Sequence, residues 1–213
     1  MKFFSGLIIV MLLIFVPSGT LHYINGWIFM GVLFIPMLII GIFLAVKNPD
    51  LLRKRLNLNE KASEQKNVVK LSGLVFIAGF VTAGLDYRFQ WTAVPQWTVI
   101  TASAIFLISY IMYAEVLREN AYLSRTVEVQ ENQKVIDTGL YGIVRHPMYS
   151  ATVFMFLSIP LILGSLISFL IFLFYPAVIV IRILSEEKIL ENSLKGYPQY
   201  KNKVRYRLIP FIW

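Results

Sequence analysis

Long uncharged runs dominate the hydrophobic pattern of this chain. Residues 3–46 contain no Lys, Arg, Asp or Glu. Because a helix needs about 20 residues to cross the hydrocarbon core of a bilayer, this run predicts two crossings. Pro17, Ser18 and Gly19 are typical turn residues and predict the connection between them. A signal peptide after Lys2 is the alternative, but no small-x-small cleavage pattern follows, and a second uncharged run begins at once.

Three further apolar runs predict the remaining crossings. The third and fourth predicted spans cover residues 68–85 and 91–114, and a last apolar block covers residues 147–181. Gly164 and Ser165 interrupt this block, which is short for two full crossings, so we expect a tilted or partly re-entrant hairpin. The pattern predicts an all-α fold: a polytopic transmembrane helical bundle with about six crossings, or five if one end segment lies only in the interface.

The charges add an orientation to this picture. The chain is 57% hydrophobic and 15% charged, and its net charge is +8. Of its 20 Lys and Arg residues, 19 fall in gaps on the same predicted side of the membrane, and only Arg88 falls on the other side. The positive-inside rule therefore places both termini and the polar segments at 47–70, 118–145 and 182–207 in the cytoplasm. We expect no nucleic-acid partner, because the basic residues lie in gaps between apolar runs rather than on one water-exposed face.

The pattern predicts a single integral membrane domain over residues 1–213. Residues 1–117 would form four transmembrane helices with a basic cytoplasmic loop at 47–70, and residues 118–213 a core of cytoplasmic loop, helical hairpin and C-terminal tail. Asn48 as N-cap and Pro49 at the first helical position predict a short interfacial helix. Between residues 126 and 136, apolar positions alternate around a polar turn, which favours a small cytoplasmic β-hairpin.

Candidate chemistry gathers where the last polar loop becomes apolar helix, in the block Arg145-His146-Pro147-Met148-Tyr149. Pro147 suits a first helical position, and a helix that begins there has amide donors that can hold a carboxylate or phosphate. The alternative is that Arg145 and His146 merely reach out to the lipid headgroups.

A second candidate cluster lies at the far end of the last apolar block. Arg182 precedes Glu186 by four residues, so the two share a helix face, and Glu187 follows directly. A carboxylate pair beside an Arg can bind a cationic or polyhydroxylated ligand; in the alternative, the glutamates face water on an amphipathic helix. Upstream, Gly139 and Gly142 permit a close backbone approach to a ligand. We expect no metal centre, since the chain has two His and no Cys.

With these motifs, the second half of the chain resembles the isoprenylcysteine carboxyl methyltransferase family and its phospholipid methyltransferase relatives. The resemblance is carried by residues 135–141 and 145–149, by Arg182 with Glu186 and Glu187, and by the tail at 197–210. It implies S-adenosyl-L-methionine as the cofactor. It implies Arg182 and Tyr149 at the methyl acceptor, with Arg182 catalytic, and the following residues at the cofactor: Tyr141, Gly142, His146, Pro147, Glu186 and Glu187. The family often has Gly-Pro-Tyr where this chain has Leu140 before Tyr141, which implies a less rigid loop.

The function implied by the resemblance is methyl transfer to a lipophilic acceptor at the cytoplasmic membrane interface. The acceptor would resemble an isoprenylcysteine carboxylate or another lipid-like carboxylate, phenol, thiol or amine, and membrane lipids would be its partners. Two alternatives remain. One is a membrane sterol-reductase-like enzyme that uses NADPH, and the other is a non-catalytic membrane protein that retains the fold.

Overall fold

In the computed structural model, which describes residues 2–56, 63–123 and 129–213, helices form nearly all of the regular structure. The elements are α1 (Lys2–Ser18), α2 (Ile24–Lys47), α3 (Pro49–Leu56), α4 (Ser63–Phe89), α5 (Gln96–Glu119), the 3₁₀ turn η1 (Gly139–Gly142), α6 (Pro147–Leu163), α7 (Leu166–Phe172), α8 (Phe174–Ser193) and α9 (Tyr197–Lys203). Across the described ranges there is no strand. The all-α prediction is confirmed.

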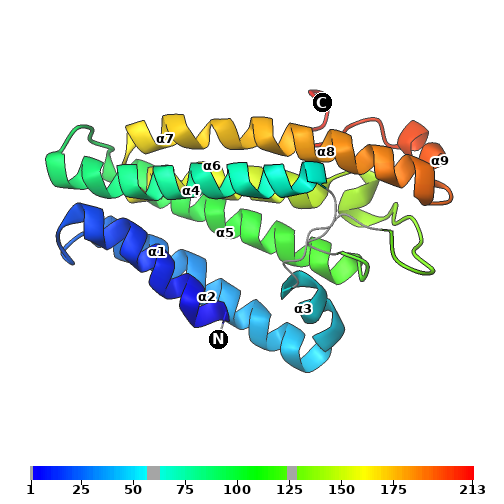
Figure 1. Cartoon of the computed structure of the whole chain (residues 1–213), viewed down its shortest axis with the longest axis horizontal. Coiled ribbons are helices and arrows are strands. Elements are labelled where there is room, and N and C mark those ends of the chain that lie inside the picture. Colours follow the sequence, from blue (N-terminus) through cyan, green and yellow to red (C-terminus); the bar gives the residue numbers. More distant parts are fainter. Residues whose placement is uncertain (1, 57–62, 124–128) are drawn as a thin grey trace.

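Six apolar segments run along the long axis of the molecule (Figure 1). Within the described ranges, four are long and apolar enough to cross a membrane, and they cover Ile24–Lys47, Lys66–Phe89, Gln96–Glu119 and Leu166–Ser193. The other two are the shorter apolar helices α1 and α6. The chain therefore folds as a polytopic helical membrane bundle, as the hydropathy pattern predicts.

Two predicted helix boundaries agree with the structure. Gly164 ends α6 in the left-handed region, with φ of +79°, and the side chain of Ser165 accepts a hydrogen bond from the backbone N–H of Ser168 to begin α7. This turn makes the interrupted apolar block a hairpin. In the basic loop that begins at residue 47, Asn48 Oδ1 accepts a hydrogen bond from the Leu51 N–H at 3.2 Å, and α3 begins at Pro49.

The connection between α4 and α5 lies further along the chain than predicted. Helix α4 continues through Phe89, past the expected end at residue 85, and α5 begins at Gln96 rather than at residue 91. The reason is the burial of Asp86, which is 1% exposed. Its carboxylate accepts hydrogen bonds from the Thr92 N–H, at 2.7 Å, and from the hydroxyl of Ser165. A charged group with these donors does not need to leave the helix for water.

The predicted β-hairpin at residues 126–136 is only partly testable. Its first residues, 126–128, lie outside the described ranges. Over the described residues from 129 onward the chain forms a turn, in which the Gln133 N–H donates to the Gln130 carbonyl at 3.1 Å, but no strand. In this described part, Val129 and Val135 pack against a cluster of Leu194, Tyr197, Tyr200 and Val204.

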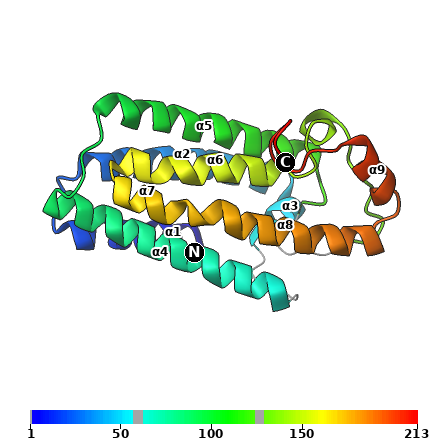
Figure 2. The same cartoon turned by 90° about the horizontal axis from the view of Figure 1, so that it is seen from above.

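The helices pack around α6, which contacts α2, α4, α5, α7 and α8. Helix α6 lies between α5 and the α7–α8 segment, and α4 packs against α7 and α8 (Figure 2). The short connections α1–α2, α4–α5 and α6–α7 gather at one end of the bundle, while α3, α9 and the loop after α5 lie at the other (Figure 1). The candidate residues at 141–149 and 182–187 therefore lie at the same end.

Close contact between α1 and α4 depends on Gly84. A Cβ built at this residue would lie 2.5 Å from the backbone carbonyl oxygen of Ile14 and 2.9 Å from Cβ of Pro17. We expect Gly84→Ala to lower the free energy of unfolding by about 1–3 kcal/mol through overpacking, measured by thermal unfolding in detergent micelles. Gly73→Ala, in the same helix with nothing within 4 Å of its Cβ, is the matched control. Equal stability of the two variants would contradict this packing.

Candidate functional site: a polar pocket at one end of the bundle

The first wall of the site is the start of α6. Pro147 is the first helical residue, as predicted, and His146 is the N-cap. Arg145 and His146 are 5% and 6% exposed. They therefore do not reach the lipid headgroups, and that alternative is wrong, because both side chains turn inward to a buried carboxylate.

This carboxylate belongs to Glu187 of α8, which is 3% exposed. Its Oε1 accepts a hydrogen bond from Arg145 Nε at 2.7 Å and lies 3.3 Å from His146 Nε2. Its Oε2 accepts from Arg207 Nε at 2.9 Å. A buried carboxylate is tolerated only when it is paired and hydrogen-bonded in this way. Glu187 thus connects the start of α6, the end of α8 and the C-terminal tail.

The tail also occupies backbone donors beside α6. The amides of Arg145 and His146 donate to the carbonyls of Tyr206 and Arg207, at 2.9 and 3.0 Å. The Arg145 guanidinium donates to the carbonyl of Val204 at 2.8 Å. At these two amides, which directly precede α6, the hydrogen-bond acceptors are carbonyls of the C-terminal tail.

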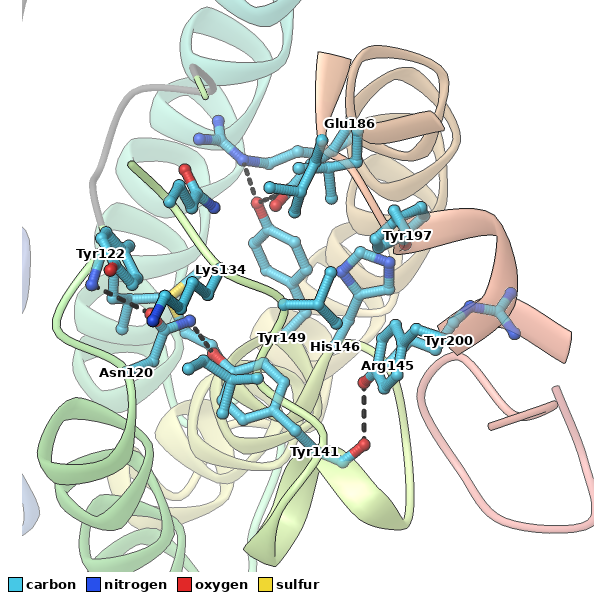
Figure 3. Close-up of a pocket in the computed structure, with 18 residues that line it drawn as sticks. Asn120, Tyr122, Lys134, Tyr141, Arg145, His146, Tyr149, Glu186, Tyr197 and Tyr200 are labelled. Carbon is cyan, nitrogen blue, oxygen red and sulfur yellow. Dashed lines mark hydrogen bonds between the residues drawn. The ribbon is translucent and has the colours of Figure 1, made fainter. Parts of the chain in front are cut away.

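A second polar group, separate from the one around Glu187, also joins α6 to α8. The Tyr149 hydroxyl donates to Glu186 Oε2 at 2.6 Å and accepts from Arg182 Nε at 2.8 Å. The Arg182 guanidinium lies 5.9 Å from the centre of the Tyr149 ring. Figure 3 shows the Tyr149 hydroxyl at the centre of the site with Glu186 above it. One hydroxyl therefore holds a cation and a carboxylate in fixed positions.

The third wall comes from η1 and the end of α5. The Tyr141 hydroxyl accepts a hydrogen bond from Asn120 Nδ2 at 2.9 Å, and its carbonyl accepts one from the Tyr200 hydroxyl at 2.7 Å (Figure 3). Gly139 has a φ of +50°, and a Cβ there would overlap a carboxylate oxygen of Glu119. The close approach predicted at Gly139 is thus to Glu119 of the chain itself.

An exposed ion pair fastens this loop to α9. Lys203 Nζ lies 2.6 Å from Asp137 Oδ2. The hydrogen bond from Lys203 lowers the pKa of the Asp137 carboxyl below its ordinary value of 3.8. Because the folded-state pKa is depressed, this contribution is complete above the ordinary value and is lost as the pH falls through the lowered one. The fastening therefore persists at neutral pH.

These walls surround a partly open pocket. The pocket has a polar side with Arg182 and Glu186, and an apolar and aromatic side with Leu190, Leu194 and Tyr200. The residues that line it are Asn120, Tyr122, Leu123, Gln133, Lys134, Val135, Ile136, Tyr141, Arg145, His146, Met148, Tyr149, Arg182, Glu186, Leu190, Leu194, Tyr197 and Tyr200.

Most residues singled out from the sequence meet in this pocket. Its lining includes Tyr141, His146, Tyr149, Arg182 and Glu186. The two helix ends far apart in sequence are thus brought together, and Arg182 and Glu186 do share a face of α8.

Three of the residues singled out are absent from the described lining: Gly142, Pro147 and Glu187. Pro147 sets the start of α6, and Gly142 lies in η1 behind Tyr141. The place predicted for Glu187 at the cofactor stays a prediction, and in this structure its oxygens bond to neighbouring side chains of the chain.

Sequence reasoning missed several lining residues. Tyr197 and Tyr200 belong to the tail that carried the family resemblance, and that resemblance was the available signal. Asn120, Tyr122 and Lys134 lie in a polar loop without a motif, and no pattern in the sequence marks them as part of a pocket.

The bridging hydroxyl of Tyr149 gives a test of this geometry. We expect Tyr149→Phe to lower the free energy of unfolding by about 1–3 kcal/mol, because it removes the hydrogen bonds of one buried hydroxyl to both Arg182 and Glu186. Tyr122→Phe is the control, since it removes an exposed hydroxyl that donates to the Asn132 carbonyl at 3.1 Å. Thermal unfolding that ranks Tyr122→Phe as the more damaging change would count against the bridge.

Fold and pocket together define an integral membrane protein with a pocket lined by polar and aromatic side chains at one end of its helical bundle. Residues 97–196, from α5 to the end of α8 and the turn after it, match the model of the phospholipid methyltransferase family. This match confirms the resemblance predicted from the sequence. The chain is also 29% identical over 91 residues to the Delta(14)-sterol reductase of Mus musculus. That similarity covers 41% of this chain and only 22% of the relative.

Proposed function

We propose that the protein is an S-adenosyl-L-methionine-dependent methyltransferase that methylates a lipophilic acceptor at the cytoplasmic face of a membrane. The observation that carries the proposal is the pocket in which Arg182 and Glu186 of α8 face Tyr141, His146 and Tyr149. The family match over residues 97–196 supports the reaction class. The acceptor would be an isoprenylcysteine-like or other lipid-like carboxylate, phenol, thiol or amine.

The charges and aromatic rings of the lining suit this cofactor. S-adenosyl-L-methionine supplies a methyl group on a positively charged sulfonium. Glu186 offers a carboxylate to a cation, and the rings of Tyr141, Tyr149 and Tyr200 offer π-faces that attract one. His146 and the tyrosine hydroxyls are hydrogen-bonding groups for an amino acid or ribose moiety.

Arg182 is the group that would hold the methyl acceptor. Its planar guanidinium matches a carboxylate or another anion in a two-pronged geometry. Its neighbours on α8, Ile181 and Leu184, are 54% and 43% exposed on the apolar bundle surface. An acceptor with a lipid tail could therefore lie along these residues in the bilayer and present its polar head to Arg182.

The chain would act by orientation and by exclusion of water. Methyl transfer from a sulfonium is a single in-line displacement, so the protein needs no covalent nucleophile of its own. Holding two reactants in line contributes up to about 7–11 kcal/mol to such a reaction. Arg182 and Glu186, fixed on either side of the Tyr149 hydroxyl, would set this alignment, and the apolar wall would limit water around an anionic acceptor.

Calorimetric titration tests the proposal against its alternatives. We expect S-adenosyl-L-methionine to bind the purified protein and NADPH not to bind. The second candidate function is a reductase, which the similarity to a sterol reductase favours; it predicts that NADPH binds and S-adenosyl-L-methionine does not. Binding of NADPH alone would replace the proposal with a reductase. Absence of binding by either molecule would favour a protein that keeps the fold without catalysis.

The orientation proposed for the site follows from the basic residues. The pocket lies at the bundle end that holds α3 and α9, whose segments carry most of the Lys and Arg residues (Figure 1). The positive-inside rule then places the pocket and both termini in the cytoplasm, where a charged, water-soluble methyl donor is available. A single cysteine introduced at Lys201 tests this orientation. We expect a membrane-impermeant reagent to label it only after the membrane is opened.

A further inference from the structure

Tyr197 carries a buried hydroxyl to which the described residues of the chain give no partner. The residue is 4% exposed and lines the pocket. Among the described residues, its hydroxyl and Glu119 Oε2 are the buried side-chain polar atoms without a hydrogen bond. Glu119 is not part of the described lining, whereas Tyr197 lies beside His146 and Glu186 at the pocket wall (Figure 3). Because a buried hydroxyl without a partner is unfavourable, such a group indicates where a ligand atom completes the site.

The surroundings of Tyr197 limit the shape of that ligand. Leu190, Leu194, Val135 and Tyr200 pack around it and also line the pocket. This side of the pocket is therefore apolar and aromatic. It suits a flat ring that stacks on or slides against these side chains and offers one polar atom to the hydroxyl.

The charges around Tyr197 limit the type of that polar atom. Burial raises the pKa of the Tyr197 hydroxyl far above its ordinary value, and the negative charge of Glu187 adds to the rise, so the group remains a neutral donor. The charge of Glu186 also raises this pKa, whereas the charge of Arg145, which is hydrogen-bonded to Glu187 and to backbone carbonyls, lowers it. A phosphate or carboxylate would be repelled here, whereas a neutral acceptor such as a ring nitrogen would not.

We propose that the Tyr197 hydroxyl donates a hydrogen bond to a purine ring nitrogen of the methyl donor, so that the apolar side of the pocket is the subsite for the heterocycle. This inference rests on the proposed function, since it takes the nucleoside of the donor as the ligand. It leaves the polar side, with Arg182 and Glu186, for the sulfonium centre and the acceptor.

A binding experiment tests the assignment without turnover. The probes are S-adenosylhomocysteine, which lacks the transferable methyl group, and its 1-deaza, 3-deaza and 7-deaza analogues. We expect Tyr197→Phe to bind S-adenosylhomocysteine about tenfold more weakly than the original protein. One deaza analogue should bind the original protein about tenfold more weakly than S-adenosylhomocysteine does, but should bind Tyr197→Phe with no further loss. In the absence of ligand, Tyr197→Phe should unfold at the same or a higher temperature, because the lost hydroxyl has no partner among the residues that the structure describes.

Tyr200→Phe is the matched control. It removes a neighbouring hydroxyl that already donates to the Tyr141 carbonyl, so it should lower the unfolding temperature and still discriminate against the same deaza analogue. Equal affinity of Tyr197→Phe for S-adenosylhomocysteine would overturn the inference, and so would a loss that is coupled to none of the three ring nitrogens. Failure of the original protein to bind S-adenosylhomocysteine would instead refute the proposed function, and the inference with it.

Discussion

Glu187→Ala is expected to lower the free energy of unfolding by about 3–5 kcal/mol, the largest stability loss among the variants considered. Removal of one partner of a buried ion pair leaves the remaining charge uncompensated. Here the loss would strand the guanidinium of Arg145, which is 5% exposed, and would release Arg207 and the C-terminal tail from α8. Thermal unfolding of the two proteins in the same detergent measures the difference.

Glu191→Ala supplies the control for this change. Glu191 is one helical turn further along α8 and pairs with Lys201, but both side chains are 37% exposed. Exposed pairs contribute about 0–1 kcal/mol, so this variant should unfold close to the original temperature. If Glu187→Ala proved as stable as Glu191→Ala, the buried network would not be the element that holds the pocket walls together.

Arg182→Ala is expected to reduce methyl transfer to a lipophilic acceptor by about 100-fold or more. In the proposed function Arg182 stabilises the anionic acceptor during transfer, and removal of one such preorganised group commonly costs two to three orders of magnitude in rate. Arg182→Lys should restore little of the loss, since an ammonium does not reproduce the planar fork of a guanidinium. The measurement is the rate of label transfer from S-adenosyl-L-methionine at saturating cofactor.

Binding and a distant arginine provide the controls for Arg182. Affinity for S-adenosylhomocysteine should change only a few-fold in Arg182→Ala, because the role is assigned at the acceptor. Arg118→Ala removes an exposed arginine that pairs with Glu115 on α5, and it should transfer methyl groups at the original rate. Full activity of Arg182→Ala would remove this residue from the catalytic proposal.

The fold was largely predictable because its signals are local. An uncharged run of bilayer length, the turn at Gly164 and the cap at Asn48 each specify an element without reference to distant parts of the chain. The end of α4 was not predictable in this way. Asp86 looks like a residue of an aqueous loop until Thr92 and Ser165, far along the chain, supply its donors.

The candidate site shows the same division between local and distant signals. Arg182 and Glu186 could be paired from their spacing, since residues four apart lie on one helix face. The sequence did not show that Glu187, unlike Glu186, would lie outside the pocket lining. Successive helical residues point about 100° apart, so one glutamate faces the pocket and its neighbour does not. Only the folded tail determines that Arg207 meets Glu187 there.

The most direct test of the central claim is to incubate the purified protein with methyl-labelled S-adenosyl-L-methionine and a total membrane lipid extract. If one pocket joins the methyl donor at Glu186 and the tyrosines to a lipid-like acceptor at Arg182, label should appear in an extractable lipophilic product, and Arg182→Ala should abolish it. A protein that binds S-adenosyl-L-methionine and leaves every lipid unlabelled would contradict the account.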